Sequence, residues 1–191
     1  MKFKARFLWI PAALLGGLIG HAANAQEPTW FGQSADGRWL IGAKVGRVDK
    51  TTTGFSEETG YGFNFGYEFA RPIGFDGSSS LEFEYMSSDD GDFTDESDLG
   101  IDGLYEVETY AMFFAYRTPG TVFFKGKLGA MYTKIDLDST AGHEKQTDTN
   151  LGFGAGFGVR AGESVNIELE YTGSAGDSDV NFITLGVSVL F

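Results

Sequence analysis

The amino-acid sequence predicts an all-β protein, an eight-stranded antiparallel up-and-down transmembrane β-barrel. Three observations favour this fold. Apolar and polar residues alternate with a period of two from residue 39 onward, the connections alternate between shorter and longer ones, and the bulky apolar residues gather on one face. Such alternation is typical of strands with two different faces, and the alternating connection lengths are typical of barrels that cross a membrane.

The first 25 residues are predicted to be a secretory signal peptide. Lys2, Lys4 and Arg6 precede an apolar stretch, and Ala23-Asn24-Ala25 resembles a cleavage site. The apolar stretch is too short for a membrane-spanning helix, which needs about 20 apolar residues. We therefore expect a signal peptide (1–25), a polar N-terminal segment (26–38) and a barrel (39–191).

Composition excludes some classes of protein. The 191-residue chain has a formal net charge of -13, and removing the three positive charges of the signal peptide makes it -16. A nucleic acid is bound by basic surfaces, so no nucleic-acid partner is expected. The chain has no cysteine, so disulfides do not hold it together.

Eight segments with this alternation are the predicted strands. In order they are 39–48, 59–69, 80–87, 104–117, 121–135, 148–160, 163–172 and 180–191. The shorter connections are 70–79, 118–120 and 161–162, and the polar, mostly longer ones are 49–58, 88–103, 136–147 and 173–179. With both barrel ends in the periplasm, the shorter turns lie on the periplasmic side and the acidic loops lie outside the cell.

Side-chain volume indicates which face contacts lipid. The interior of an eight-stranded barrel holds only modest side chains, so the bulky apolar face must point outward. In strand 104–117 we place Val107, Thr109, Ala111 and Phe113 on this face. An aromatic girdle at the outer membrane interface is expected from Tyr61, Tyr85, Tyr105, Tyr132 and Tyr171.

The opposite face carries small and charged residues, which suit a narrow polar lumen. The inward positions of strand 148–160 are the alternate glycines Gly152, Gly154, Gly156 and Gly158, which leave room for long neighbouring side chains. Charges away from bulk water are tolerated when they are paired, so we expect ion pairs, with solvation by trapped water as the alternative. The predicted lumen ion-pair network is Lys44, Glu68, Glu82, Glu84, Glu108, Lys125, Lys127, Glu168 and Glu170.

Basic residues near the strand ends suggest contacts with lipid phosphates. Arg47 and Lys134 lie just beyond the outer girdle, where lipopolysaccharide phosphates would be partners through charge-assisted hydrogen bonds. Snorkelling of these long side chains is a compatible alternative. At the periplasmic ends, Arg38, Arg71, Arg117 and Arg160 are expected to suit inner-leaflet phosphates.

No catalytic residue or cofactor is predicted. His143 is the one histidine after the signal peptide, and it has no serine two residues on, which a deacylase-like site would require. An acidic stretch in the second outer loop is a weak metal candidate, because its spacing differs from that of an EF-hand and a solvated acidic surface explains it better. Its first acidic residues are Asp89, Asp90, Asp92 and Asp95.

Taken together, these features resemble the eight-stranded outer-membrane barrels of the OmpA and OmpX type, the family of outer membrane protein beta-barrel domains. The resemblance is carried by the signal peptide, by the stretch YGFNFGYEF (61–69) and by a last strand that ends in Phe191. It implies an integral protein of a Gram-negative outer membrane with a largely closed lumen. It also implies insertion from the periplasm by chaperones and the assembly machinery, with Phe191 as part of the assembly signal.

Three functions are compatible with such a barrel. The first is a non-enzymatic, monomeric protein that supports envelope integrity or surface interaction through acidic loops, with outer-membrane lipids and lipopolysaccharide as partners. The second is a narrow cation-preferring channel, because three inward lysines face seven glutamates (68, 82, 84, 106, 108, 168 and 170). The third is a lipid A-modifying enzyme, which would depend on His143 or an unpaired glutamate.

Overall fold

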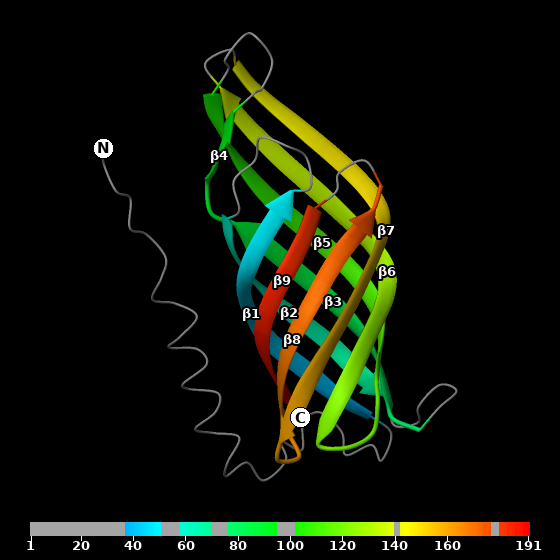
Figure 1. Cartoon of the computed structure of the whole chain (residues 1–191). Coiled ribbons are helices and arrows are strands. Elements are labelled where there is room, and N and C mark those ends of the chain that lie inside the picture. The colour runs from blue at the N-terminus through cyan, green and yellow to red at the C-terminus, as the bar shows by residue number, and fades with distance from the viewer. Residues whose placement is uncertain (1–36, 51–57, 70–75, 95–101, 140–141, 177–179) are drawn as a thin grey trace.

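The chain folds into a closed antiparallel β-barrel, which confirms the predicted fold class (Figure 1). The computed structural model describes residues 37–50, 58–69, 76–94, 102–139, 142–176 and 180–191, so the predicted signal peptide lies outside the described residues. Within these residues there is no helix long and apolar enough to cross a membrane. The strands are β1 (Gly37–Lys50), β2 (Glu58–Phe69), β3 (Ser78–Ser88), β4 (Gly91–Thr94), β5 (Asp102–Arg117), β6 (Val122–Ser139), β7 (Gly142–Ala161), β8 (Val165–Ala175) and β9 (Val180–Leu190).

Eight of these strands form the wall, and each pairs antiparallel with its two neighbours. The wall closes where β1 pairs with β9, from Leu40↔Leu190 to Lys50↔Val180. Trp39 and Phe191 continue this seam, since the backbone N–H of each donates to the carbonyl of the other at 2.9 Å. The short β4 lies beside the outer end of β5, beyond the point where β3 and β5 stop pairing. Closure satisfies the backbone groups of every strand in the membrane, which open sheet edges cannot do.

The outward face of the wall is a band of exposed apolar side chains. Val45, Phe124 and Leu128 are more than half exposed, whereas the neighbouring lumen-facing Lys44, Lys125 and Lys127 are buried. Aromatic rings lie side by side on this face, as in Tyr85–Tyr110 and Tyr110–Tyr132, with centroids 5.0 and 6.3 Å apart. Such a surface would be unfavourable in water and is suited to lipid.

The third outer connection differs from the prediction, because most of 136–147 is strand and not loop. β6 continues to Ser139 and β7 begins at Gly142, so this hairpin projects at the outer end of the barrel together with the first residues of β5, which pair with β6 as far as Gly103↔Ser139 (Figure 1). Pairing of β7 with β8 begins only at Leu151↔Ala175, and residues 142–150 pair with β6 alone. Buried Ile135 and partly buried Leu137 pack against an apolar cluster inside the barrel, which stabilises this continuation.

The faces of β5 are reversed relative to the prediction. Tyr105, Val107, Thr109, Ala111 and Phe113 are buried in the lumen and do not face lipid, so Tyr105 does not belong to the girdle. The outward face of β5 carries large exposed side chains, which are Leu104 near the outer end and then Tyr110, Met112 and Phe114. This register lets the small Ala111 and Ala115 fill the narrow interior and places the guanidinium of Arg117 among buried carboxylates.

Candidate functional site: a charged and apolar lumen

Eight charged side chains fill the part of the lumen that lies nearer the short turns. They come from five strands, and none is more than 6% exposed. Four are cations and four are carboxylates, so the formal charges cancel. We call this set the ion cluster: Lys44, Glu82, Glu84, Arg117, Lys125, Lys127, Glu168 and Glu170.

The level of the ion cluster nearest the turns is built around Arg117. Its Nη1 lies 2.7 Å from Glu82 Oε1, and its Nε donates to Glu168 Oε1 at 2.7 Å. The Lys125 ammonium contacts the second oxygen of each carboxylate, at 2.9 Å for Glu82 and 3.1 Å for Glu168. Ser80 completes this level, since its hydroxyl donates to Glu82 Oε1 at 2.6 Å and accepts from Arg117. Each carboxylate therefore has two cationic partners.

A second level is formed by two lysines that share two carboxylates. The Lys44 ammonium donates to Glu84 Oε1 at 2.7 Å and to Glu170 Oε1 at 2.6 Å. The Lys127 ammonium donates to Glu84 Oε2 and to Glu170 Oε1, both at 2.6 Å. The two levels are joined by Lys125, whose Nζ lies 2.7 Å from Glu170 Oε2. The cluster is therefore one continuous network.

Glycines beside the cluster make room for these long side chains. A Cβ added at Gly154 would lie 2.5 Å from the Lys127 side chain and 2.8 Å from a backbone carbonyl. Two strands away, on β9, a Cβ added at Gly186 would lie 3.1 Å from the Lys44 side chain. The inward glycines of β7 are therefore needed for space, as the sequence pattern indicates.

Apolar side chains fill the lumen nearer the outer loops, which the sequence analysis did not predict. One cluster, which we call the apolar plug, consists of Val48, Met86, Tyr105, Val107, Ile135, Val180 and Phe182. A smaller cluster of Ala111, Phe113 and Met131 touches the charged part, since the Lys127 ammonium lies 4.3 Å from the Phe113 ring centroid. Val48 lies on the same face of its strand as the inward Lys44, and Phe182 on the same face as the inward Thr184. Apolar residues at these inward positions were the feature of the sequence that could have predicted an apolar filling.

Two glutamates of the predicted network lie apart from the ion cluster. Glu68 faces the lumen but pairs with Arg38 at the barrel mouth, 2.7 Å away. Glu108 requires correction, because the reversed register of β5 turns it outward, where it accepts from Lys134 at 2.9 Å. The sequence analysis missed Arg117, which it placed at inner-leaflet phosphates and which is 1% exposed inside the barrel.

The two basic residues expected at lipopolysaccharide both lie on the outside of the wall. Arg47 is exposed on β1. Lys134 has carboxylates beside it already, with Asp136 at 2.7 Å in addition to Glu108. These hydrogen bonds raise the pKa of Lys134 and lower the pKa of Asp136, so the charge of this lysine is compensated within the protein.

The remaining candidates lie at the outer end of the barrel. Asp89, Asp90 and Asp92 are exposed, and Asp95 lies outside the described residues. Within the part of the chain that the structure describes, no three histidine, aspartate or glutamate side chains are grouped so that they could hold a metal ion. The ring of His143 pairs with Asp138 at 2.5 Å near the end of the exposed β6–β7 hairpin.

Comparisons with known proteins agree with this architecture. The family model for the outer membrane protein beta-barrel domain matches residues 10–191. The chain is similar to the solved structure of Ail, the attachment invasion locus protein of Yersinia pestis. The two sequences are 22% identical, the match covers 82% of this chain and 98% of that chain, and the TM-score is 0.53.

Two structures from Pseudomonas aeruginosa are also similar. For the N-terminal barrel domain of OprF, the identity is 16%, 81% of this chain and 99% of that chain are covered, and the TM-score is 0.54. For OprG the identity is 15%, the coverage is 81% and 96%, and the TM-score is 0.53. At these identities the likeness is one of fold. A comparison with curated proteins finds no match.

Proposed function

The chain belongs to the family of outer membrane protein beta-barrel domains, and from that premise we propose that it is a non-enzymatic, sealed barrel that supports envelope integrity and surface interaction. It is an integral protein of the outer membrane. The observation that carries the proposal is the filling of the lumen, first by the balanced ion cluster and then by the apolar plug. A conducting pore needs a continuous polar path, and both fillings oppose one.

The ion cluster opposes conduction because its charges already satisfy one another. An ion that entered would have to replace short contacts such as Lys44–Glu170 and Lys127–Glu84, both 2.6 Å. Removing one partner from a buried pair costs about 3–5 kcal/mol. An entering cation would therefore gain a carboxylate only by displacing an ammonium group that is held between two of them.

The apolar plug is a second barrier in series with the first. Tyr105, Val107 and Phe182 are at most 1% exposed, so these side chains have almost no surface that water can reach. A hydrated ion crossing this level would lose its water without gaining polar ligands. This argument favours a sealed barrel over the cation-preferring channel that the inward glutamates suggested.

We propose that outer-membrane lipids are the partners of the wall. The exposed apolar band would contact acyl chains, and the row of Tyr85, Tyr110 and Tyr132 would lie at headgroup depth, where amphipathic rings are favoured. Arg47, which is exposed on the outside of β1, would contact lipopolysaccharide phosphates through charge-assisted hydrogen bonds. The projecting β6–β7 hairpin would present polar side chains to surface partners.

Single-channel conductance of the refolded mature protein in a planar bilayer tests the sealed lumen. The wild type should pass no steady current. The K125E/K127E variant replaces two cations by two anions, so repulsion should open the cluster while the apolar plug still blocks steady current. Adding F182G, which removes a bulky side chain from the plug, should then give cation-selective openings. The K125M/E168Q variant keeps the charges balanced and should stay closed, as a matched control. Steady cation-selective conductance in the wild type would overturn the proposal in favour of the channel.

A further inference from the structure

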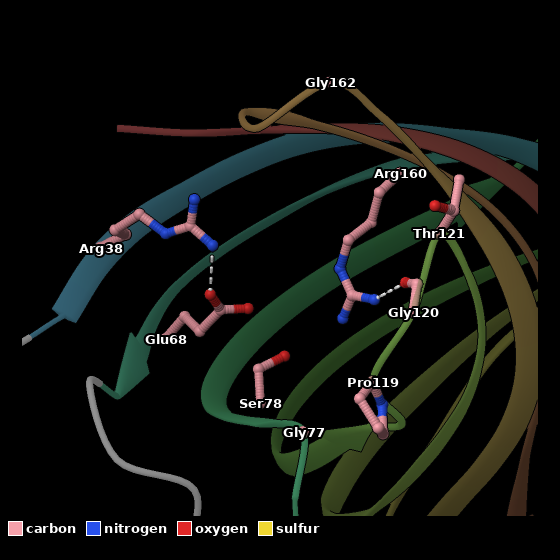
Figure 2. Close-up of a pocket in the computed structure, with 9 residues that line it drawn as sticks. All are labelled: Arg38, Glu68, Gly77, Ser78, Pro119, Gly120, Thr121, Arg160 and Gly162. Carbon is pink, nitrogen blue, oxygen red and sulfur yellow. Dashed lines mark hydrogen bonds and ion pairs between the residues drawn. The ribbon is translucent and has the colours of Figure 1, made fainter.

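The short-turn end of the lumen contains a cavity of about 680 Å³ that the ion cluster does not fill. Its lining comes from strand ends and turns that meet only when the barrel closes (Figure 2). We call it the vestibule, and its polar side chains are Arg38, Glu68, Ser78, Thr121 and Arg160. A cavity of this size falls within the range of small-molecule sites, roughly 300–1,000 Å³.

The charges of the vestibule do not cancel, unlike those of the ion cluster. Arg38 pairs with Glu68 and also donates to the carbonyl of Glu163, each at 2.7 Å. Arg160 forms no ion pair with a carboxylate of the described residues, and its guanidinium stacks 4.6 Å from the Phe123 ring centroid. The vestibule therefore has one uncompensated positive charge, on a side chain whose position is fixed.

Among the described residues, the hydrogen bonds of Arg160 leave one edge of its guanidinium open. Its Nη1 donates to the carbonyls of Thr118 and Gly120, and its Nη2 also donates to Thr118. The remaining N–H bonds are on Nε and Nη2, the parallel pair that binds a carboxylate in a bidentate manner. In Figure 2 these two nitrogens face the open space toward Glu68 and Ser78, away from Gly120.

Two further groups border this open space. The Ser78 hydroxyl oxygen is buried and has no hydrogen-bond partner within the part of the chain that the structure describes. Glu68 uses one carboxylate oxygen for Arg38, and Figure 2 shows the other oxygen directed toward the side on which Arg160 lies. A buried polar atom without a partner is unfavourable, which indicates that a polar ligand or ordered water belongs there. The space thus has a bidentate cationic donor on one side and a carboxylate acceptor on the other.

We propose that the vestibule binds the α-amino-carboxylate group of a free amino acid from the periplasm. The ligand carboxylate accepts from Nε and Nη2 of Arg160 and from the Ser78 hydroxyl, and the ligand ammonium donates to Glu68. A purely cationic ligand would be repelled by Arg160, and a purely anionic one would leave the second Glu68 oxygen without a donor. Because the lumen beyond the vestibule is filled, the ligand binds at this end and does not pass through.

NMR titration of the ¹⁵N-labelled mature protein in lipid nanodiscs tests this proposal with three compounds of nearly equal size. Alanine carries both charges, propionate lacks the ammonium group and alaninamide lacks the carboxylate. Alanine should shift the backbone amides of Gly77, Gly120 and Gly162, which line the vestibule, and leave Gly60 at the outer end unmoved. With so few contacts a dissociation constant of about 1 mM is expected, and the two analogues should bind at least about tenfold more weakly.

Variants separate the two halves of the site. R160Q should abolish the alanine shifts, and E68Q should remove the preference for alanine over propionate. R47Q removes an arginine from the outside of the wall and should change nothing, as a matched control. Should R160Q fail to refold, S78A removes one hydroxyl and should weaken alanine binding severalfold. Equal shifts from all three compounds, or no vestibule shifts up to about 50 mM alanine, would overturn the proposal.

Discussion

The substitution Lys125→Met unbalances the ion cluster by one charge with little change in volume. The Lys125 ammonium joins the two levels of the cluster, lying 2.9 Å from Glu82, 3.1 Å from Glu168 and 2.7 Å from Glu170. Its loss leaves four buried carboxylates with three cations. The substitution therefore tests whether charge balance in the lumen contributes to stability.

The expected loss follows from the contacts. Breaking a buried ion pair by removing one partner costs about 3–5 kcal/mol, because the remaining charge is left uncompensated. Arg117 and the other two lysines still contact the same carboxylates, which places the expected loss nearer the lower value. A second substitution, Glu168→Gln, restores equal numbers of charges, so K125M/E168Q should be more stable than K125M alone. A favourable coupling of about 1–3 kcal/mol is expected between two residues in one network.

Reversible urea unfolding in lipid vesicles, followed by tryptophan fluorescence, measures these differences. K145M is the matched control, because Lys145 is 56% exposed and lies 3.4 Å from Asp136. An exposed pair contributes about 0–1 kcal/mol, so K145M should resemble the wild type. The reasoning fails if K125M is as stable as K145M, or if the double variant is less stable than K125M.

Three further outcomes are expected. G154A should destabilise the barrel by about 1–3 kcal/mol in the same unfolding assay, because the new Cβ meets a lysine side chain and a carbonyl, whereas G126A meets nothing within 4 Å and should be tolerated. F182A should cost about 3–5 kcal/mol, since it leaves a cavity in the apolar plug, and a loss below 1 kcal/mol would contradict close packing there. The Lys134–Asp136 pair should contribute its full stabilisation at pH values above 3.8, the ordinary aspartate pKa. This stabilisation should be lost as the pH falls through the pKa of Asp136 in the folded protein, which is lower. In K134M, NMR titration should show a higher pKa for Asp136.

Alternation in the sequence was sufficient to predict the barrel and every charged side chain of the ion cluster except Arg117. In β7, the alternate glycines could only face a crowded interior, and the lysines of β6 and glutamates of β8 pointed to the same side. The volume and the charge of the side chains therefore predict the same inward face for these three strands. The glycines are the most informative residues, because a Cβ added at Gly152, Gly154 or Gly158 would lie 2.5–2.8 Å from a bulky lumen side chain.

The register of β5 could not be read in the same way, because both of its faces are apolar. Glu106 and Glu108 suggested an inward face, yet they lie toward the outer end of the strand, where an outward carboxylate meets water or a lysine. The better signal was size. Tyr110, Met112 and Phe114 form the bulkier face, and Ala111 and Ala115 form the smaller one, which the narrow interior requires.

The ion cluster also offers a physical reason why the strands pair in this register. Its charges come from β1, β3, β5, β6 and β8, so they meet only when the wall closes. A slip of β8 by one residue would turn Glu168 and Glu170 from the lumen to the lipid, because successive side chains point to opposite faces. A slip by two residues would keep them inside but displace them by one level, away from Lys125 and Arg117. Both errors leave buried charges uncompensated at a cost of several kcal/mol, so the network disfavours the neighbouring registers. Apolar contacts in the plug are less directional, so they discriminate less strongly between registers.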